Sequence, residues 1–173
     1  MTSPSPLSSL RVSSWIAVVQ AYQACQRQYA RLLSAFDLTI AQFDLLATVD
    51  DAGGDATPAM VAERLMVTRG NVSPLLHRVI EQGWVRERPH PDDRRSVQLS
   101  MTAKGSALLR RARAASSCFI AEQLSPFDDD EVTWTLVQMR AMRKHLEGMD
   151  VDAILERAKK INSSAASTAK GAR

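Results

Sequence analysis

Hydrophobic side chains recur at helical spacing along most of this chain of 173 residues. Between Ser14 and Leu33, for instance, apolar residues fall three or four positions apart, which is the repeat of one face of an α-helix. Six further segments follow, and most of them are bounded by turn residues or prolines. We therefore expect a mostly helical fold, with helices at residues 14–33, 38–49, 58–65, 68–82, 102–123, 128–147 and 151–160.

Capping residues mark the starts of the helices. Thr39 and Gln42 have the spacing of a capping box, in which each side chain bonds to the backbone N–H of the other residue. Thr57 precedes a proline that suits the first position of a helix, and Thr68 stands where the next helix should begin. Gly83 suits the end of that helix, because glycine readily adopts the left-handed conformation common there. These signals predict two short helices joined by a tight turn.

Strand-like alternation replaces the helical spacing directly after this turn. Residues 84–88 and 96–100 each alternate between apolar and polar side chains. The intervening residues 90–95, His-Pro-Asp-Asp-Arg-Arg, contain turn formers and charges. The pattern predicts a β-hairpin with a basic tip. Because a hairpin after two such helices makes a winged helix-turn-helix, we expect a mostly α fold with a small β-hairpin wing.

Polar residues occupy one side of the predicted helix 68–82. The apolar stripe, which must pack on the preceding helices, comprises Val72, Leu75, Leu76, Val79 and Ile80. In a DNA major groove, arginine can bond to guanine and asparagine to adenine, while hydroxyl and imidazole groups reach bases or phosphates. A solvated polar face is the alternative, but the adjoining turn and basic hairpin favour DNA. The predicted major-groove contacts are Thr68, Arg69, Asn71, Ser73, His77 and Arg78.

Pro74 lies inside the same helix. A proline there removes one backbone hydrogen bond and costs roughly 3 kcal/mol in an isolated helix. We expect a mild kink rather than the end of the helix, because the freed carbonyl of Gly70 can turn toward water or a side chain. The kink either aims residues 69–73 into the groove or is simply tolerated.

Charge is concentrated near the predicted wing. The formal net charge of +3 is small for the whole chain and is a weak argument for nucleic acid. Residues 57–105, however, hold eight basic residues against five acidic ones. Arg94 and Arg95 can enter a narrow minor groove, with Asp93 orienting the arginine. The alternative is a neutral surface turn, in which these arginines pair with neighbouring aspartates.

Several function classes are disfavoured by the residues present. Cys25 and Cys118 lack metal-ligand spacing, so we expect buried thiols rather than a disulfide or a zinc site. His77, His90 and His145 show neither metal-site spacing nor a nucleophile motif, so we predict no metal, no cofactor and no catalytic residue. No apolar run reaches the ~20 residues of a membrane span, and the N-terminus lacks the pattern of a signal peptide. We therefore expect a cytoplasmic protein that contacts no membrane.

The ends of the chain differ in composition from the middle. Residues 1–10 contain two prolines among serines, which predicts a flexible arm. From Arg157 onward, five basic residues and no acidic residue stand in a Ser/Ala-rich stretch, which predicts a basic tail after a short helix. The predicted helix 128–147 carries more apolar surface than one lobe can cover. That excess favours a second subunit, although a bundle within one chain is the alternative.

The order of these motifs resembles the MarR family of bacterial regulators over residues 15–146. The resemblance is carried by Leu-Thr-x-x-Gln-Phe at 38–43, VAERL at 61–65, SPLLHRVIEQGWVRER at 73–88 and DDRRSVQLSMTAKG at 92–105. It implies a homodimer with interleaved first and last helices and two recognition helices in successive major grooves of a pseudopalindromic operator. Asp93 and Arg95 match the family's wing pair. The implied organisation is an arm (1–10), one domain (11–150) with the winged helix-turn-helix at 38–105 and dimerisation helices at 11–34 and 102–150, and a short helix with a tail (151–173).

The resemblance also implies a mode of regulation. Family members respond to small aromatic anions or hydrophobic compounds bound between the dimer helices and the DNA-binding lobe, or to oxidation of a cysteine. Trp15, Tyr22 and Phe43 are the predicted effector pocket, although a Trp and a Tyr at helical spacing more often belong to a core. Trp15 occupies the position of the sensing cysteine in the peroxide-responsive branch. We therefore expect a repressor that a small effector releases from DNA; the alternatives are a winged-helix protein-interaction module and a thiol-based regulator using Cys25 or Cys118.

Overall fold

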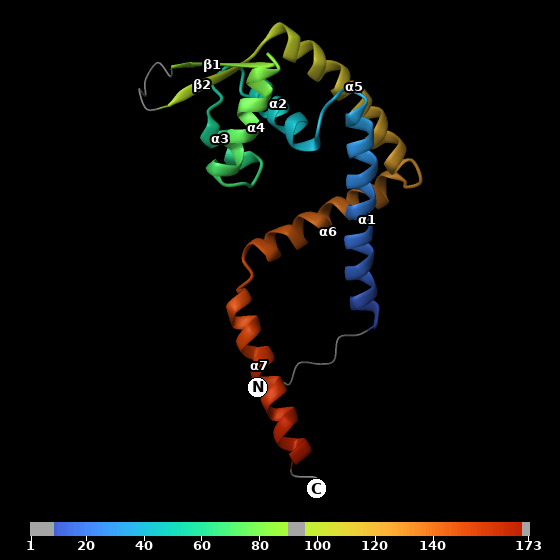
Figure 1. The fold of residues 1–173 in the computed structure, drawn as a ribbon. Helices are drawn as coiled ribbons and strands as arrows, with labels where there is room; N and C mark the ends of the chain where they lie inside the picture. The colour runs from blue at the N-terminus through green and yellow to red at the C-terminus, as the bar shows by residue number, and fades with distance from the viewer. Residues whose placement is uncertain (1–8, 90–95, 171–173) are drawn as a thin grey trace. The chain divides into compact units, whose positions relative to one another are not determined.

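The computed structural model describes residues 9–89 and 96–170, and of residues 69 and 163–170 it describes the backbone alone. The elements in this part of the chain are α1 (Ser9–Ser34), α2 (Ile40–Asp51), α3 (Pro58–Arg64), α4 (Arg69–Glu81), β1 (Val85–Pro89), β2 (Val97–Met101), α5 (Ala103–Leu124), α6 (Asp129–Glu147) and α7 (Val151–Lys170) (Figure 1). The chain divides into two compact units, residues 1–123 and residues 124–173. The first unit contains the winged helix-turn-helix, which confirms the predicted fold class.

The first unit is built around an aliphatic core. Its fully buried side chains come from α1, α2, α3, α4, both strands and α5, and the largest are Leu33, Leu45, Leu46, Val49, Val61, Val72, Val79, Val85, Leu99 and Leu109. Burial of apolar surface on this scale is the main favourable term in folding. Residues distant in sequence thereby fix how α4 and the hairpin are held.

Side-chain caps start α2 and α3 as the sequence predicts. The Thr39 N–H donates to Gln42 Oε1 at 2.8 Å, and the Gln42 N–H donates to Thr39 Oγ1 at 3.2 Å. Thr57 Oγ1 accepts from the Met60 N–H at 3.3 Å, with Pro58 at the start of the helix. Thr68 precedes α4 with an extended backbone, but its side chain makes no capping hydrogen bond. The three threonines therefore mark three helix starts, and only two of them cap in this way.

The two strands form an antiparallel hairpin. Their register pairs Val85 with Met101 at the base and Pro89 with Val97 toward the tip. The loop before α3 joins β2 from the side, because the Leu99 N–H donates to the Ala56 carbonyl at 2.8 Å. Both of these residues are buried. The wing is thus fixed to the helix-turn-helix through the middle of β2.

The start of α5 is bonded to the turn that follows α4. Thr102 Oγ1 donates to the Gly83 carbonyl at 2.7 Å, and the Thr102 N–H donates to the Trp84 carbonyl at 3.0 Å. Lys104 Nζ donates to the Gln82 carbonyl at 2.7 Å. Gly105 packs so closely here that a Cβ would overlap the Trp84 carbonyl oxygen and lie 2.8 Å from its carbonyl carbon. No side chain fits at this position, so glycine is required for α5 to meet α4.

Two helices extend beyond the ends that hydrophobic spacing predicts. α1 begins at Ser9, within the stretch expected to be an arm, and α7 continues to Lys170 rather than ending near Lys160. The added stretch of α7 is rich in alanine, which has the highest helix propensity. Because alanine and serine contribute no strong hydrophobic pattern, spacing alone places the end of this helix too early.

The second unit consists of the end of α5 followed by α6 and α7. Asp128 and Glu131 form a capping box at the start of α6, with backbone-to-carboxylate distances of 2.9 and 3.1 Å. No residue of α6 is buried within the chain. Its exposed large apolar side chains are Trp134, Leu136, Val137, Met139, Met142 and Leu146.

The cysteines differ from the prediction of buried thiols. Cys118 is exposed on α5, and Cys25 on α1 is half-buried. The Cys25 thiol donates to Gln123 Oε1 at 3.4 Å. The prediction was wrong for Cys118, because the inward face of α5 is occupied by other residues, including Leu109, Ala112 and Ser116. None of the described helices combines the length and apolar content that a bilayer span needs.

Candidate nucleic-acid interface

Helix α4 presents one apolar and one exposed side. Val72, Leu76 and Val79 are buried, and Leu75 and Ile80 are half-buried against the core. This confirms the predicted packing stripe. The exposed side chains in the remainder of the helix belong to Asn71, Ser73, Pro74, His77, Arg78 and Glu81. Arg69 is the first residue of the helix.

The centre of the exposed side is formed by Gly70, Pro74 and His77. Their spacing of four and then three residues places them on one face of the helix. A Cβ on Gly70 would meet only Thr68 Oγ1, at 3.9 Å, so nothing in the described chain requires glycine there. The helix continues through Pro74 to Glu81, as predicted. Sequence reasoning overlooked Gly70 and Pro74 as members of this face, although their spacing from His77 was a usable signal.

Asn71 and Arg78 lie on a flank of this face rather than at its centre. They line a mainly apolar hollow of about 460 Å³ between α4 and α2, together with Asp44 and Leu75. Burial raises the pKa of the Asp44 carboxyl above its usual value. The predicted major-groove residues are therefore divided, with Ser73 and His77 facing outward and Asn71 and Arg78 also bordering the hollow.

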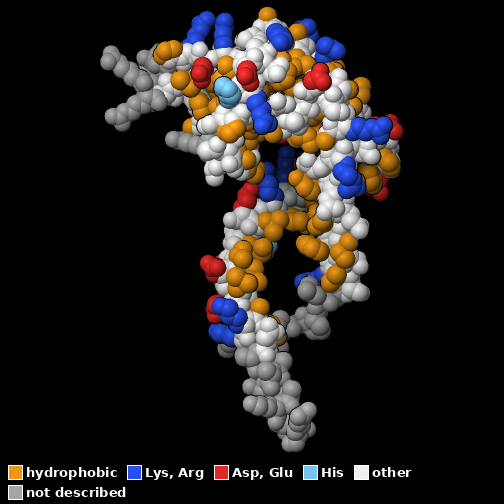
Figure 2. All heavy atoms as spheres, viewed as in Figure 1, with side chains coloured by type: hydrophobic (Ala, Val, Ile, Leu, Met, Phe, Trp, Pro, Cys, Tyr) orange, Lys and Arg blue, Asp and Glu red, His pale blue; other side chains and the backbone are white. Residues whose placement is uncertain are grey.

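The wing adds basic side chains next to α4. Arg86 and Arg88 are exposed on β1, and Arg86 Nε donates to Ser100 Oγ across the hairpin at 2.9 Å. Figure 2 shows Lys and Arg side chains gathered over the hairpin end of the lobe. The predicted tip contacts, Asp93, Arg94 and Arg95, lie outside the described residues. Strands β1 and β2 run toward that segment from either side.

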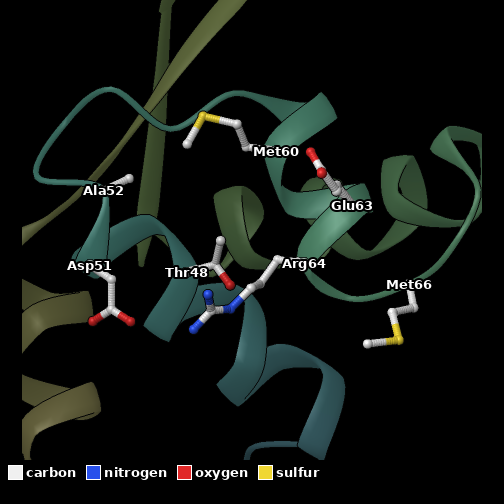
Figure 3. A pocket seen from close by; sticks show the side chains of 7 residues that line it. All are labelled: Thr48, Asp51, Ala52, Met60, Glu63, Arg64 and Met66. Atoms are coloured by element: carbon white, nitrogen blue, oxygen red, sulfur yellow. The ribbon is translucent and has the colours of Figure 1, made fainter. Parts of the chain in front are cut away.

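A second hollow, of about 490 Å³, lies between α2 and α3 (Figure 3). The Arg64 side chain extends from α3 toward Thr48 and Asp51 of α2, and Met60 and Met66 stand at opposite ends. Met66 lies in the turn between α3 and α4 with a φ of 53°, a conformation that usually favours glycine. Its side chain is 77% exposed, so the fold gains little from it.

The predicted effector residues are not gathered around one hollow within the described chain. Trp15 and Tyr22 are largely exposed on α1, whereas Phe43 is buried in α2. Phe43 packs edge-on against Tyr29, with ring centroids 6.0 Å apart. The Tyr29 hydroxyl is 2.9 Å from Ser116 Oγ, and burial raises the Tyr29 pKa. Trp15 and Tyr22 can therefore contribute to a pocket only when another molecule or subunit covers α1.

Arg113 of α5 holds the end of α2. Its Nη1 is 2.6 Å from Asp50 Oδ2, and its Nη2 is 2.6 Å from Asp51 Oδ1. These groups are partly exposed, so the contribution to stability is modest. The geometry is nevertheless specific, because one guanidinium spans two adjacent carboxylates. Sequence spacing gave no signal for this pair, since Arg113 lies 62 and 63 residues from its partners.

The side chains that could bind a metal ion are not clustered in the part of the chain that the structure describes. Among the described residues, no cluster of three His, Cys, Asp or Glu side chains is placed to hold a metal ion. His77 and His145 lie on α4 and α6. The exposed face of α4 and the basic hairpin remain the features suited to a polyanionic partner.

Comparison with known proteins identifies the family. Residues 36–96 match the sequence profile of the MarR family. The HTH-type transcriptional regulator PecS of Dickeya dadantii (strain 3937) is 30% identical over 122 residues, which cover 69% of this chain and 74% of PecS. The chain is a member of the MarR family. The predicted resemblance is thereby confirmed.

Solved structures show the same fold. A mutant MarR from Escherichia coli complexed with operator DNA is 25% identical to this MarR-family chain, with a TM-score of 0.70 over 80% of this chain and 99% of that one. The organohalide-sensing regulator RdhR in its 2,4-dichlorophenol-bound form is 19% identical, with a TM-score of 0.70 over 84% and 87% of the two chains. The second likeness concerns the fold alone. The chain is a MarR-family transcriptional regulator with a DNA-binding winged helix-turn-helix.

Proposed function

We propose that the protein is a homodimeric repressor that binds a pseudopalindromic operator and leaves it when a small aromatic or hydrophobic compound binds. The observation that carries the DNA-binding part is the exposed face of α4 beside the basic hairpin. Gly70 leaves open space at the centre of that face, which suits close approach of a duplex. The MarR structure solved on operator DNA supports the same use of this fold.

In this proposal α4 enters the major groove. Ser73 and His77 contact base edges or phosphates, and Asn71, Arg78 and Arg69 contact the flanks of the groove. The Thr68 hydroxyl, which makes no cap bond, donates to a backbone phosphate. Arg94 and Arg95 enter the adjacent minor groove, with Asp93 orienting Arg95.

Dimerisation is proposed to occur through α1, α5 and α6, which correspond to residues 11–34 and 102–150. Exposed apolar side chains support this assignment, because monomeric proteins rarely leave such extended apolar surface in water. Trp15 and Tyr22 on α1 and Trp134 on α6 are each about two-thirds exposed within one chain. Figure 2 shows hydrophobic side chains exposed along α1 and α6. Two subunits would present two α4 helices to successive major grooves.

Release by an effector is proposed to act through α5. Thr102 and Lys104 bond this helix to the end of α4, and Arg113 bonds it to the end of α2. A compound that changes the position of α5 therefore changes the separation of the two α4 helices and lowers operator affinity. We propose that Trp15 and Tyr22, once covered by the partner, line an effector pocket on α1, whereas Phe43 supports α1 from the core through Tyr29.

The decisive test is selection of genomic fragments by the purified protein, followed by mobility-shift titration at several salt concentrations. We expect one pseudopalindrome with half-sites about one helical turn apart, bound at least ~10³-fold more tightly than random DNA. His77→Ala and Arg95→Ala should each weaken operator binding by about 1 to 3 kcal/mol. Glu156→Gln on α7 is the matched control and should leave the affinity unchanged.

Two outcomes would contradict the proposal. Weak binding that does not depend on sequence, at every salt concentration, would instead favour a protein-interaction module. Operator release only after oxidation, and not after addition of small aromatic compounds, would favour a thiol-based regulator. In that case Cys118→Ser and Cys25→Ser would show which thiol is used.

A further inference from the structure

Helix α7 has a narrow apolar face. Val151, Ile154, Leu155 and Ile161 lie on it, with exposed fractions of 58, 37, 53 and 51%. Residues 151, 154, 158 and 161 follow the spacing of three, four and three residues that defines the seam of a coiled coil. Position 158 is an alanine, which allows close approach of a second helix. Residues 151–161 of α7 therefore supply four successive seam positions, which are those of two heptads.

Among residues 151–162, where the side chains of α7 are described, all the charged residues lie outside this seam. They are Asp152, Glu156, Arg157, Lys159 and Lys160, and Lys159 pairs with Glu156 at 2.7 Å on the outer face. Helices that lie on anionic membranes usually combine many Lys and Arg residues with Trp or Phe. α7 mixes both charge signs and contains no aromatic residue. Its composition is that of a helix that pairs with another helix.

Most of the stability of a helix in a protein comes from the packing of its apolar face rather than from helix propensity. The seam is about as wide as one partner helix, and it contains no charge that would oppose a copy of itself. Pairing of identical faces is the usual arrangement across a two-fold axis. The neighbouring α6, in the same unit, also exposes apolar side chains, so the apolar surface continues from one helix to the next along the chain.

We infer that the apolar face of α7 pairs with the same face of α7 from a second copy of this chain, forming a short two-stranded coil. This inference rests on the proposed homodimer, which brings the two helices into one complex. Two heptads alone pair weakly, but tethering to an existing dimer raises their effective concentration to about the millimolar range. The α7 pair thus adds a C-terminal contact to the interface of α1, α5 and α6.

Cysteine cross-linking tests this pairing directly. In a full-length background with Cys25→Ser and Cys118→Ser, Ile154→Cys and Ala158→Cys are introduced singly, and Glu156→Cys serves as the outward-facing control. Under mild oxidation we expect disulfide-linked dimers from the seam variants, formed at least ~10-fold faster than from the control. An equimolar mixture of the two seam variants tests for antiparallel pairing, in which residue 154 of one copy lies next to residue 158 of the other. Cross-linking in either the parallel or the antiparallel orientation supports the inference.

A charge substitution provides the second test. Ile154→Asp should raise the dimer dissociation constant about tenfold, because it places a carboxylate in the seam. Ala153→Asp adds the same charge on the outer face one position earlier and should leave the constant unchanged. Sedimentation of dilution series measures both variants, and circular dichroism verifies that each is folded.

The outcomes separate this inference from the proposed function. A chain that is dimeric and binds its operator, yet shows no preference for seam cross-links and no effect of Ile154→Asp, refutes the α7 pairing alone. A monomeric chain without operator binding refutes the proposed function itself. Binding of the protein to phosphatidylglycerol vesicles, abolished by Ile154→Asp, would overturn the pairing and assign the face to a membrane surface.

Discussion

Gly105→Ala tests whether contact between α5 and the end of α4 holds the DNA-binding lobe together. The added Cβ would overlap the Trp84 carbonyl oxygen and lie 2.8 Å from its carbonyl carbon, whereas real Cβ atoms essentially never come closer than 3.0 Å to such atoms. The obstacle is backbone, so a change of side-chain rotamer cannot relieve it. The start of α5 must therefore move away from the turn that follows α4.

That movement disturbs the bonds from Thr102 to the Gly83 and Trp84 carbonyls. Overpacking typically costs about 1 to 3 kcal/mol, and each weakened hydrogen bond costs about 1 kcal/mol more. We expect the free energy of unfolding to fall by roughly 2 to 4 kcal/mol. We also expect weaker operator binding, because α4 loses its fixed position relative to α5.

Urea denaturation followed by circular dichroism, at one protein concentration for all variants, measures the loss of stability. Gly148→Ala is the matched control, because a Cβ there would meet its nearest atoms at 3.9 Å, an ordinary contact. An unfolding midpoint for Gly105→Ala equal to that of the wild-type protein would refute the packing argument. Equal losses in both variants would mean that glycine replacement itself, rather than the clash, is responsible.

Three further substitutions probe other parts of the lobe. Pro74→Ala should stabilise the protein by about 1 to 3 kcal/mol, because it restores a backbone hydrogen bond, and should weaken operator binding by altering the centre of the exposed face of α4; unchanged affinity in a mobility shift would place the ring outside the interface. Met66→Gly should raise the stability by about 0.5 to 1 kcal/mol, since glycine relieves the positive φ at the loss of little burial; a lower melting temperature would contradict this. Asp44→Asn should stabilise the protein at neutral pH and not at low pH. Burial raises the pKa of the Asp44 carboxyl in the folded state, so the wild-type protein loses stability as the pH rises through that folded pKa, and the asparagine variant does not. Denaturation of the wild-type protein and the Asp44→Asn variant from about pH 3 to 8 covers this titration. The two curves of unfolding free energy against pH should converge at the acid end, and parallel curves would count against a raised Asp44 pKa.

Local signals in the sequence determined the helices of the winged lobe and the face of α4 that packs inward. Each of these signals involves residues within one or two helical turns of one another. They are the capping box at Thr39, the Thr57 cap and the spacing of Val72, Leu76 and Val79. Such interactions depend on neighbours along the chain and can be inferred from it. The same is true of the order of motifs that identifies the family.

Only the tertiary structure decided which residues from distant segments meet. The close contact of Gly105 with Trp84 and the bridge from Arg113 to Asp50 and Asp51 join residues 21 to 63 positions apart, and no periodicity encodes them. The sequence also could not show that Asn71 borders a hollow beside α2, or that Cys118 is exposed, because these properties depend on which other helices pack against each helix. Local propensities determine where the helices and strands form. The packing of apolar faces from distant segments determines which of their other side chains are exposed.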